Sequence, residues 1–319
     1  MSLKTEIERL QPLDGPTPEP FSVFLSVVIP THHRASSIGN CLERLANGAQ
    51  TLEQSHYEVI VSDDGDNAET QNLIAEKFPW VRWVKSEEKG PANNRNNGAA
   101  HARGDWLVFI DDDCIAESGF LEAIYIEAKK EQIEVVEGRI FCPDERDHPF
   151  YFCPDNSGGG VFWTANLSVR AETFRALQGF DKDLAYFAED MEFGNRIKKN
   201  GTRHRFLDTA RVAHPAQKFT IAEFWRRFWS QRAMYLYAHK LGVSPHLGTN
   251  SIFVVVYVIK SHTLNIARNL KQLLCRKDRQ WKKKATMVSL QILLSPVMVP
   301  YLIYWEFRFR RQLRAKQGL

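Results

Sequence analysis

The sequence predicts an α/β fold built on a mostly parallel sheet with helices on both faces, followed by a helical C-terminal extension. Short apolar segments rich in β-branched residues recur up to Phe141, and segments with helical spacing lie between several of them. Because these strands are apolar throughout rather than alternating, they are typical of a parallel sheet buried on both faces. The expected strands are Phe21–Ile29, Tyr57–Val61, Val81–Val84, Trp106–Ile110 and Glu134–Phe141.

The helices expected between these strands are amphipathic. The first begins after Ser36 and Ser37, and serine favours the N-cap position of a helix. The apolar faces of the first and second helices consist of Ile38, Cys41, Leu42 and Leu45, and of Leu73, Ile74 and Phe78, respectively.

The length of 319 residues allows one large domain with an appendage, or two modest domains. Residues 1–20 are polar, contain prolines and lack the apolar core of a signal peptide, so we expect a flexible lead-in. We expect residues 21–217 to form the α/β domain and residues 218–319 to form a helical region that associates with a membrane or forms oligomers.

Five cysteines are scattered along the chain without a CxxC pair or the spacing of a metal finger. Their odd number and scattered placement predict reduced thiols in a cytosolic setting rather than a disulfide framework. These residues are Cys41, Cys114, Cys142, Cys153 and Cys275.

Polar residues follow three of the expected strands. Ligands of parallel α/β sheets bind outside the carboxyl ends of the strands, so these residues predict a nucleotide-type site. The three consecutive acids after Ile110 would need a metal ion, basic partners or full exposure. Side chains two apart on a strand point the same way, so Asp111 and Asp113 could share one Mg²⁺ or Mn²⁺ while Asp112 faces elsewhere. The segments are Pro30-Thr31-His32-His33-Arg34, Ser62-Asp63-Asp64-Gly65 and Asp111-Asp112-Asp113.

Each of these signals has a structural alternative. The acid triplet could be a solvated turn, and Asp-Gly is a common turn pair. Arg95 lies after Gly90, where a turn enters a helix, and would suit a diphosphate, although the phosphate-loop and dinucleotide patterns are missing. Asp190 could instead cap a helix that ends near Gly201, and His214 could be a structural histidine.

Taken in order, these segments make the chain resemble a family 2 glycosyltransferase with the GT-A fold. Any one motif is weak, but six in order are specific for the fold and the reaction, and nearly silent about the sugar. The resemblance covers about residues 22–215, roughly 60% of the chain. The matching segments are Ser26–Arg34, Val61–Gly65, Gly90–Arg95, Phe109–Asp113, Gly179–Asp181 and Glu189-Asp190.

The resemblance implies transfer of a sugar from a nucleotide-diphosphate sugar to an acceptor hydroxyl, with inversion and with Mn²⁺ or Mg²⁺ as cofactor. Residues 21–217 would then be the catalytic domain. Asp113 and His214 would bind the metal, and Asp190, with Glu189 beside it, would supply the catalytic base. The pair His32-His33 replaces the more usual aromatic-Asn pair, which leaves the base contacts less defined. The implied nucleotide-sugar-binding residues are Pro30, Thr31, Arg34, Asp64, Arg95, Asp111 and Asp112.

The C-terminal region is strongly basic. From Lys260 to the end, 14 Lys and Arg face two acids, so this part carries +12 and the preceding residues carry −8 of the total of +4. A capping box at Thr220 and Glu223 predicts a helix to about Leu241. Met287–Trp305 is apolar and flanked by basic residues, which is typical of peripheral docking on an anionic membrane, with a true span and a soluble helical subdomain or oligomer contact as alternatives.

We therefore expect a protein at the cytoplasmic face of the cell membrane that acts on a saccharide or lipid-linked acceptor. The sequence does not decide whether the protein forms homo-oligomers. A sugar nucleotidyltransferase is a rival interpretation, but it would carry a glycine-rich and basic segment near the first strand, which we do not find. A catalytically silent nucleotide-sugar-binding protein would not need both Asp113 and Asp190. Nucleic acid is not expected as a partner, because the basic residues flank apolar segments and no nucleic-acid motif is recognised.

Overall fold

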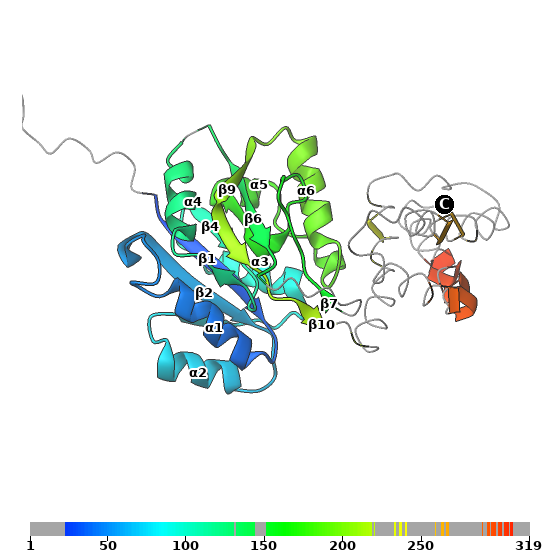
Figure 1. Ribbon diagram of the computed structural model, residues 1–319, viewed down its shortest axis with the longest axis horizontal. Helices are drawn as coiled ribbons and strands as arrows, with labels where there is room; N and C mark the ends of the chain where they lie inside the picture. Colours follow the sequence, from blue (N-terminus) through cyan, green and yellow to red (C-terminus); the bar gives the residue numbers. More distant parts are fainter. Residues whose placement is uncertain are drawn as a thin grey trace, which may run out of the picture.

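The computed structural model describes residues 23–130, 132–143 and 151–218, together with residue 220 and separate helical positions between 233 and 308. Their centre is an eight-stranded sheet with helices on both faces (Figure 1). The strands are β1 (Leu25–Thr31), β2 (Tyr57–Asp63), β3 (Arg82–Lys85), β4 (Trp106–Phe109), β5 (Ile115–Ala116), β6 (Val135–Phe141), β8 (Leu167–Arg170) and β9 (His204–Ala213). The helices are α1 (Ala35–Leu45), α2 (Glu69–Lys77), α3 (Pro91–Ala100), α4 (Phe120–Ala128), α5 (Ala171–Ala176) and α6 (Glu189–Lys199).

Short elements complete the described chain. A separate two-stranded sheet pairs β7 (Tyr151–Phe152) with β10 (Gln217–Lys218) in antiparallel fashion. Single turns of 3-10 helix are η2 (Gln54–His56), η3 (Thr164–Asn166) and η4 (Lys182–Leu184).

The strand order of the large sheet is β3-β2-β1-β4-β8-β6-β9-β5. Strands β1 to β4 are parallel to one another, and β8 runs antiparallel to both β4 and β6. Because β6 and β9 are parallel to each other, both run in the direction of β4. The carboxyl ends of β1, β2, β4, β6 and β9 therefore meet at one edge of the sheet, which confirms the expected α/β fold and makes the sheet mixed in its second half.

Two hydrophobic clusters form the core, one on each face of the sheet. Alternate residues of β1 separate them: Val27 and Ile29 belong to one cluster and Val28 to the other. The first cluster includes buried residues of α1, α2 and α4, and the second includes residues of α3, α5 and α6. Burial on both faces explains why the strands have no alternating pattern in the sequence.

Helix α3 approaches the sheet unusually closely at Gly98. A Cβ atom at this position would lie 2.5 Å from Cγ1 of Val28 in β1. Glycine therefore permits a helix-to-strand distance that no larger residue allows without movement. In α1, by contrast, a Cβ at Gly39 would meet its nearest neighbour, Leu73, at an ordinary 3.7 Å.

Three local expectations differ from the structure. Helix α1 begins at Ala35, so Ser36 and Ser37 lie inside it, and the N-cap residue is Arg34, whose side chain binds acids instead of capping. Strand β4 ends at Phe109, so the acid triplet is a turn to which the two-residue strand period does not apply. Asp190 lies in the first turn of α6, whose N-cap residue is Ala188, so it does not cap the helix.

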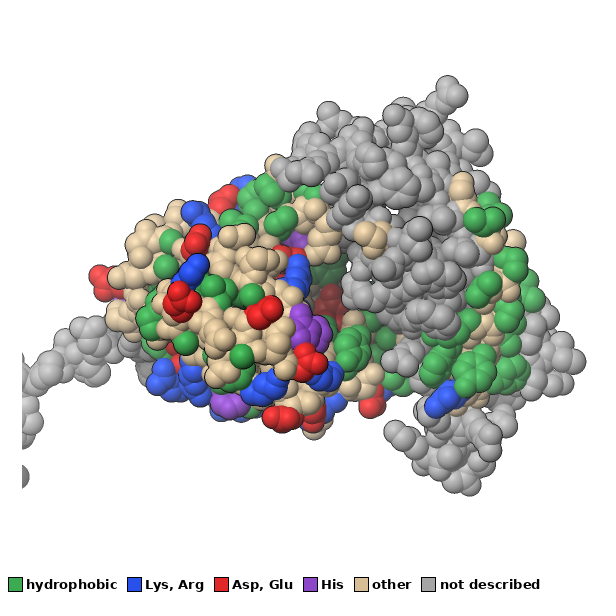
Figure 2. Space-filling view, turned by 90° about the horizontal axis from the view of Figure 1, so that it is seen from below, with side chains coloured by type: hydrophobic (Ala, Val, Ile, Leu, Met, Phe, Trp, Pro, Cys, Tyr) green, Lys and Arg blue, Asp and Glu red, His purple; other side chains and the backbone are tan. Residues whose placement is uncertain are grey.

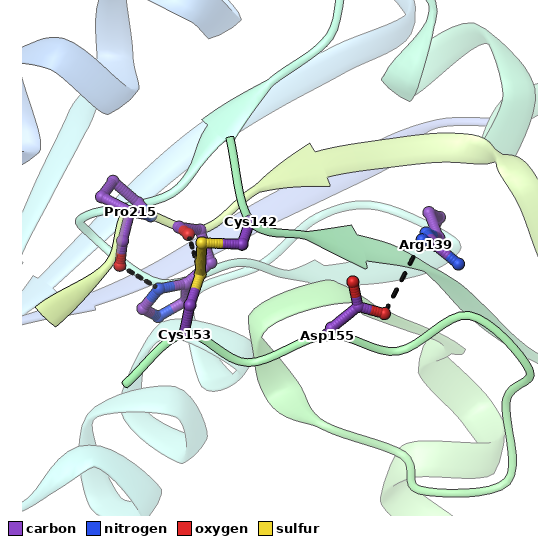
Figure 3. The surroundings of a disulfide bond; sticks show 6 residues. Arg139, Cys142, Cys153, Asp155 and Pro215 are labelled. Carbon is purple, nitrogen blue, oxygen red and sulfur yellow. Dashed lines mark hydrogen bonds and ion pairs between the residues drawn. A yellow bond between two sulfur atoms is a disulfide. The ribbon is translucent and has the colours of Figure 1, made fainter. Parts of the chain in front are cut away.

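The expectation that all cysteines are reduced thiols is wrong for one pair. Cys142 and Cys153 form a disulfide with a Cα–Cα separation of 5.8 Å (Figure 3). The ladder between β6 and β9 and the return of the chain at β7 bring the two residues together, which cysteine spacing alone does not reveal. Cys41 and Cys114 are buried free thiols, and Cys275 lies outside the described residues.

Most of the C-terminal predictions cannot be compared with the described residues. The helix expected between Thr220 and Leu241 and the apolar segment Met287–Trp305 lie largely outside them. Among the helical residues that are described, none forms a helix long and apolar enough to cross a membrane.

Candidate active site

Asp112 and Asp113 share one arginine at the carboxyl edge of the sheet. Arg34, just after β1, places Nη1 2.8 Å from Asp112 and Nη2 2.7 Å from Asp113. Thr31 donates a 2.7 Å hydrogen bond to Asp112 from the end of β1. Burial raises the pKa of Asp112 to about 7, even though Arg34 and Thr31 oppose the shift. Asp112 thus ties the acid turn to β1.

Asp111 belongs to a second ion-pair network. The buried Arg95 of α3 places Nη2 2.7 Å from Asp111 and Nη1 2.9 Å from Glu189, the first residue of α6. The pKa of Arg95 is raised although burial alone would lower it, because both carboxylates favour its charged form. Burial raises the pKa of Glu189 to about 7. One arginine therefore joins the acid turn to the start of α6.

Asp190 lies next to this network and is half-buried. Its Oδ1 accepts a 2.7 Å hydrogen bond from the backbone N–H of Met191. Burial raises the pKa of Asp190, and the nearby negative charge of Asp111 adds to the rise, while the Met191 bond and the charge of Arg95 oppose it. A carboxylate with a raised pKa is a better proton acceptor than an exposed one.

Oδ1 of Asp113 and Nε2 of His214 face each other at this edge of the sheet. His214 Nδ1 lies 3.1 Å from the carbonyl oxygen of Pro215, which can only accept, so Nδ1 carries a proton, and in the neutral form of the ring Nε2 offers a lone pair. That Nε2 lies 3.5 Å from Oδ1 of Asp113, a buried atom with no hydrogen-bond partner. Two acceptors opposed in this way fit a divalent cation between them.

The possible metal ligands between Asp113 and His214 are oxygen and nitrogen atoms. In the part of the chain that the structure describes, ligand atoms of Asp113, Cys114 and His214 lie within 4.8 Å of one another. Burial raises the pKa of the Cys114 thiol well above its usual range, so it stays protonated and is a poor ligand. The pKa of Asp113 is lowered in spite of its burial, because the positive charges of a protonated His214 and of Arg34 favour the ionised carboxylate, and a divalent cation would supply positive charge at the same place. Mn²⁺ and Mg²⁺ both fit such ligands.

Asp64 lies at the end of β2 and is almost fully buried. Its Oδ2 accepts a 2.6 Å hydrogen bond from the N–H of Gly90, and Nδ1 of His32 lies 2.9 Å from Oδ1. The His32 ring is largely exposed, at 55%, and meets His33 edge-on. Pro30 is a buried residue of β1 opposite Ser62 of β2. The pocket expected for the base thus has an exposed imidazole at its rim.

The structure adds residues that the sequence did not single out. Gln217 of β10 donates a 2.6 Å hydrogen bond to Oδ2 of Asp113. No motif marks this glutamine, and only the pairing of β10 with β7 brings it to the site. His32 was named only as a member of the first polar segment and as part of a departure from the family pattern, and its position two residues before the end of the first motif was the available signal.

The triple-glycine segment, Gly158-Gly159-Gly160, is held by a buried carboxylate. Glu137 of β6 accepts hydrogen bonds from the backbone N–H groups of Gly160, Val161 and Phe162, at 2.6, 3.1 and 2.7 Å. Gly159 donates to Asn156 Oδ1 at 2.9 Å. The amides of residues 159–162 are therefore bound by the protein itself.

The surface at the acid turn and a separate cavity have different character. Figure 2 shows a face that is hollowed where acidic side chains (red) lie deep beside a histidine (purple) and a basic side chain (blue). A cavity of about 690 Å³ lies between α3 and α5 at the opposite, amino-terminal edge of β4, with Arg103, Arg170 and Arg175 among its lining residues. It contains none of the carboxylates described above.

Family models match most of this region. The model described as "Glycosyl transferase family 2" matches residues 26–176, and "Glycosyl transferase family group 2" matches residues 106–308, more than half of the chain. The chain belongs to the family 2 glycosyltransferases. The acid turn and α5 lie in the range matched by both models, α3 lies in the range of the first alone, and α6, His214 and Gln217 lie in the range of the second.

Curated family 2 relatives have varied names. A validoxylamine A glucosyltransferase of Streptomyces hygroscopicus subsp. jinggangensis is 29% identical over 221 residues, which cover 56% of this chain and 52% of the relative. The glycosyltransferase AglE of Haloferax volcanii is 30% identical over 211 residues, which cover 61% of this chain and 68% of the relative. The chain spans about half the length of the first two curated relatives it matches.

Solved structures of low identity share the fold. TarS of S. aureus has a TM-score of 0.52 at 18% identity, covering 68% of this chain and 39% of TarS. The mannosyltransferase PcManGT of Pyrobaculum calidifontis, solved with GDP-Man and Mn²⁺, has a TM-score of 0.52 at 17% identity, covering 72% of this chain and 67% of that protein. A truncated TarS was also solved with UDP.

Proposed function

We propose that this family 2 member is a metal-dependent inverting glycosyltransferase that moves a sugar from a nucleotide-diphosphate donor to an acceptor hydroxyl. The observation that carries the proposal is that Oδ1 of Asp113 faces Nε2 of His214, at the same sheet edge as a half-buried carboxylate, Asp190, with a raised pKa. Family membership and the nucleotides bound by structures of the same fold support this donor class.

Asp113 and His214 would hold Mn²⁺ or Mg²⁺. A divalent ion bound there would offset the negative charge that develops on the departing diphosphate. Arg34 would keep Asp112 and Asp113 in place through its two ion pairs. Asp64 would accept a hydrogen bond from the base or ribose, and the exposed His32 ring beside it would contact the face of the base.

Asp190 would take the proton of the acceptor hydroxyl as its oxygen attacks the anomeric carbon. The bond to the acceptor oxygen forms while the bond to the diphosphate oxygen on the opposite face breaks, which inverts the anomeric configuration. Glu189, paired with Arg95, would act as a positioning residue that orients the first turn of α6. Arg95 would support the acid turn from beneath, because Asp111 and Glu189 occupy both of its Nη atoms.

Substitution of the proposed base tests this function. With a panel of UDP- and GDP-sugars and Mn²⁺, Asp190→Asn should lower kcat by about 10²–10⁴-fold while UDP still raises the melting temperature as in the unchanged protein. Asp208→Asn, a change of an exposed residue on β9, is the matched control and should leave kcat unchanged. Near-normal transfer by Asp190→Asn would remove Asp190 as the base. If no donor is hydrolysed and none stabilises the protein with either Mn²⁺ or Mg²⁺, the proposed function itself is overturned.

We also propose that the acceptor is a saccharide or lipid-linked saccharide at an anionic membrane surface, because residues from Lys260 onward carry a net charge of +12. Binding to vesicles of anionic lipid that is lost at high salt is the expected result. Retention after carbonate extraction would indicate a span instead, and no binding to anionic vesicles would remove the membrane from the proposal.

A further inference from the structure

The Cys142–Cys153 disulfide lies against the backbone of the proposed metal ligand His214. Cys142 directly follows β6, and the last residue of that strand, Phe141, accepts a 2.9 Å hydrogen bond from the N–H of His214. Sγ of Cys153 lies 2.9 Å from the carbonyl oxygen of His214. A disulfide sulfur carries no hydrogen, so this is a packing contact and not a hydrogen bond. The cross-link therefore contacts the carbonyl group of His214 directly, and the N–H of His214 is bonded to Phe141, the residue before Cys142.

The same cross-link also reaches Gln217. Cys153 directly follows β7, and β7 pairs with β10 through Phe152 opposite Gln217 and Tyr151 opposite Lys218. Gln217 is the residue that donates to Oδ2 of Asp113. A covalent bond at Cys153 thus fixes the strand on which β10 rests. Through β10 it fixes a hydrogen bond to the second proposed metal ligand.

Other contacts hold this segment only on one side of the cross-link. After Cys153, Asn156 donates a 2.9 Å backbone hydrogen bond to Ile140, and Asp155 lies 3.7 Å from Arg139 in a half-exposed ion pair (Figure 3). Exposed ion pairs of this kind contribute little. Before Cys153, the described contacts of β7 are those of its two-residue pairing with β10. Among the described contacts, loss of the disulfide would leave β7 with its pairing to β10, and β10 with that pairing and the Gln217 bond to Asp113.

We propose that the Cys142–Cys153 disulfide is a reversible clamp that holds His214 and Gln217 in the positions needed for metal binding by Asp113. The inference rests on the proposed function for the metal. Exchange with oxidised glutathione would form the clamp: the two protein thiols lose their protons, one protein disulfide forms, and the glutathione disulfide is reduced to two thiols. Excess dithiothreitol reverses the reaction. The clamp positions the ligands and takes no part in the transfer.

The test compares both redox states of the full-length protein in a Cys275→Ser background, which removes the thiol that lies outside the described residues. Intact mass after alkylation reports the disulfide, and electron paramagnetic resonance reports free Mn²⁺. The reduced protein should bind Mn²⁺ about tenfold more weakly than the oxidised protein, as for loss of other groups that orient metal ligands. Cys142→Ser should match the reduced protein and should not respond to oxidised glutathione.

Backbone hydrogen exchange of residues 214–218, measured without metal, separates this inference from the proposed function. Slower exchange in the oxidised state is expected whether or not Mn²⁺ binds. Mn²⁺ binding of equal affinity in both states would overturn the clamp alone. Failure to form the disulfide with oxidised glutathione would also overturn it. Absence of Mn²⁺ binding in both states would remove the metal from the proposed function, and unchanged exchange would then remove the clamp as well.

Discussion

At the scale of single residues, Arg95 joins the acid turn to helix α6. Its side chain is almost fully buried and is shared between Asp111 and Glu189. The sequence marked Arg95 for a diphosphate because of its position after a glycine turn. The structure places both of its Nη atoms on carboxylates, and a single sequence offers no sign of such pairing, since the partners lie 16 and 94 positions away.

Removal of Arg95 should be costly. Arg95→Met leaves the buried Glu189 and the half-buried Asp111 without their cation, and the free energy of unfolding should fall by about 3–5 kcal/mol. Arg103→Met removes an exposed arginine that pairs with Glu58, and the loss there should be below about 1 kcal/mol. Urea unfolding of the two variants measures the difference. Equal losses in the free energy of unfolding would show that the Arg95 network contributes no more stability than an exposed ion pair.

The raised pKa of Asp190 has a consequence for activity. Only the deprotonated form can accept the acceptor's proton, so activity is lost as the pH falls through the pKa of Asp190 in the folded protein. Because burial raises that pKa, the acid limb of kcat/KM should lie above the value of about 4 that is usual for an exposed aspartate. A pH profile of kcat/KM measures the limb, and the Asp208→Asn variant should show the same limb. An acid limb near the pKa of an exposed aspartate would contradict a base whose pKa is raised by burial.

At the scale of elements, helix α3 depends on glycine where it crosses β1. Gly98→Ala places a Cβ 2.5 Å from Val28, and such overpacking should lower the free energy of unfolding by about 1–3 kcal/mol. Gly39→Ala in α1 has room and should raise it by about 0.5–1 kcal/mol, because alanine is the better helix former. Thermal or urea unfolding of both variants gives the two signs. A stabilising Gly98→Ala would mean that α3 lies further from the sheet.

The elements themselves were largely predictable, and their ends were not. Apolar runs located β1 to β4 and β6, because burial on both faces leaves a continuous signal, whereas β5, β8 and β9 were not predicted. The buried face of α1 is the one that its spacing predicts. The start of α1 was misplaced because Arg34 is recruited by two acids that are 78 and 79 residues away in the chain. The acid triplet was expected on a strand, but the β4 ladder stops at Phe109.

At the scale of the whole molecule, the site is assembled from distant parts of the chain at one sheet edge. Ligands that bridge these parts should stabilise the folded domain as a unit. Mn²⁺ with UDP at about 100 times the dissociation constant should add about 2.7 kcal/mol to the free energy of unfolding. Asp113→Ala should abolish the Mn²⁺-dependent part of the melting-temperature shift, whereas Asp208→Asn should retain it. An unchanged shift in Asp113→Ala would exclude Asp113 as a ligand.

The whole-molecule view also shows which parts of the site a sequence can reveal. Residues at strand ends, such as Asp64 and Asp113, follow from the rule that parallel sheets bind ligands at their carboxyl edge. Gln217 and the Cys142–Cys153 disulfide do not, because both depend on a two-residue sheet that no periodicity announces. Partners set by tertiary contact are therefore the part that sequence reasoning omits.

The anchoring of the triple-glycine segment by Glu137 restricts the polarity of substrates at that turn. Three successive amide hydrogens already point at one carboxylate, so the turn has no positive dipole left to offer. A phosphate placed there would meet carbonyl oxygens and the anionic Glu137. The carbonyl oxygen of Gly160 is also occupied, because Nζ of Lys198 donates a 2.8 Å hydrogen bond to it. The amide donors of the turn are committed to Glu137, so a ligand phosphate has to find its hydrogen-bond donors elsewhere in the protein.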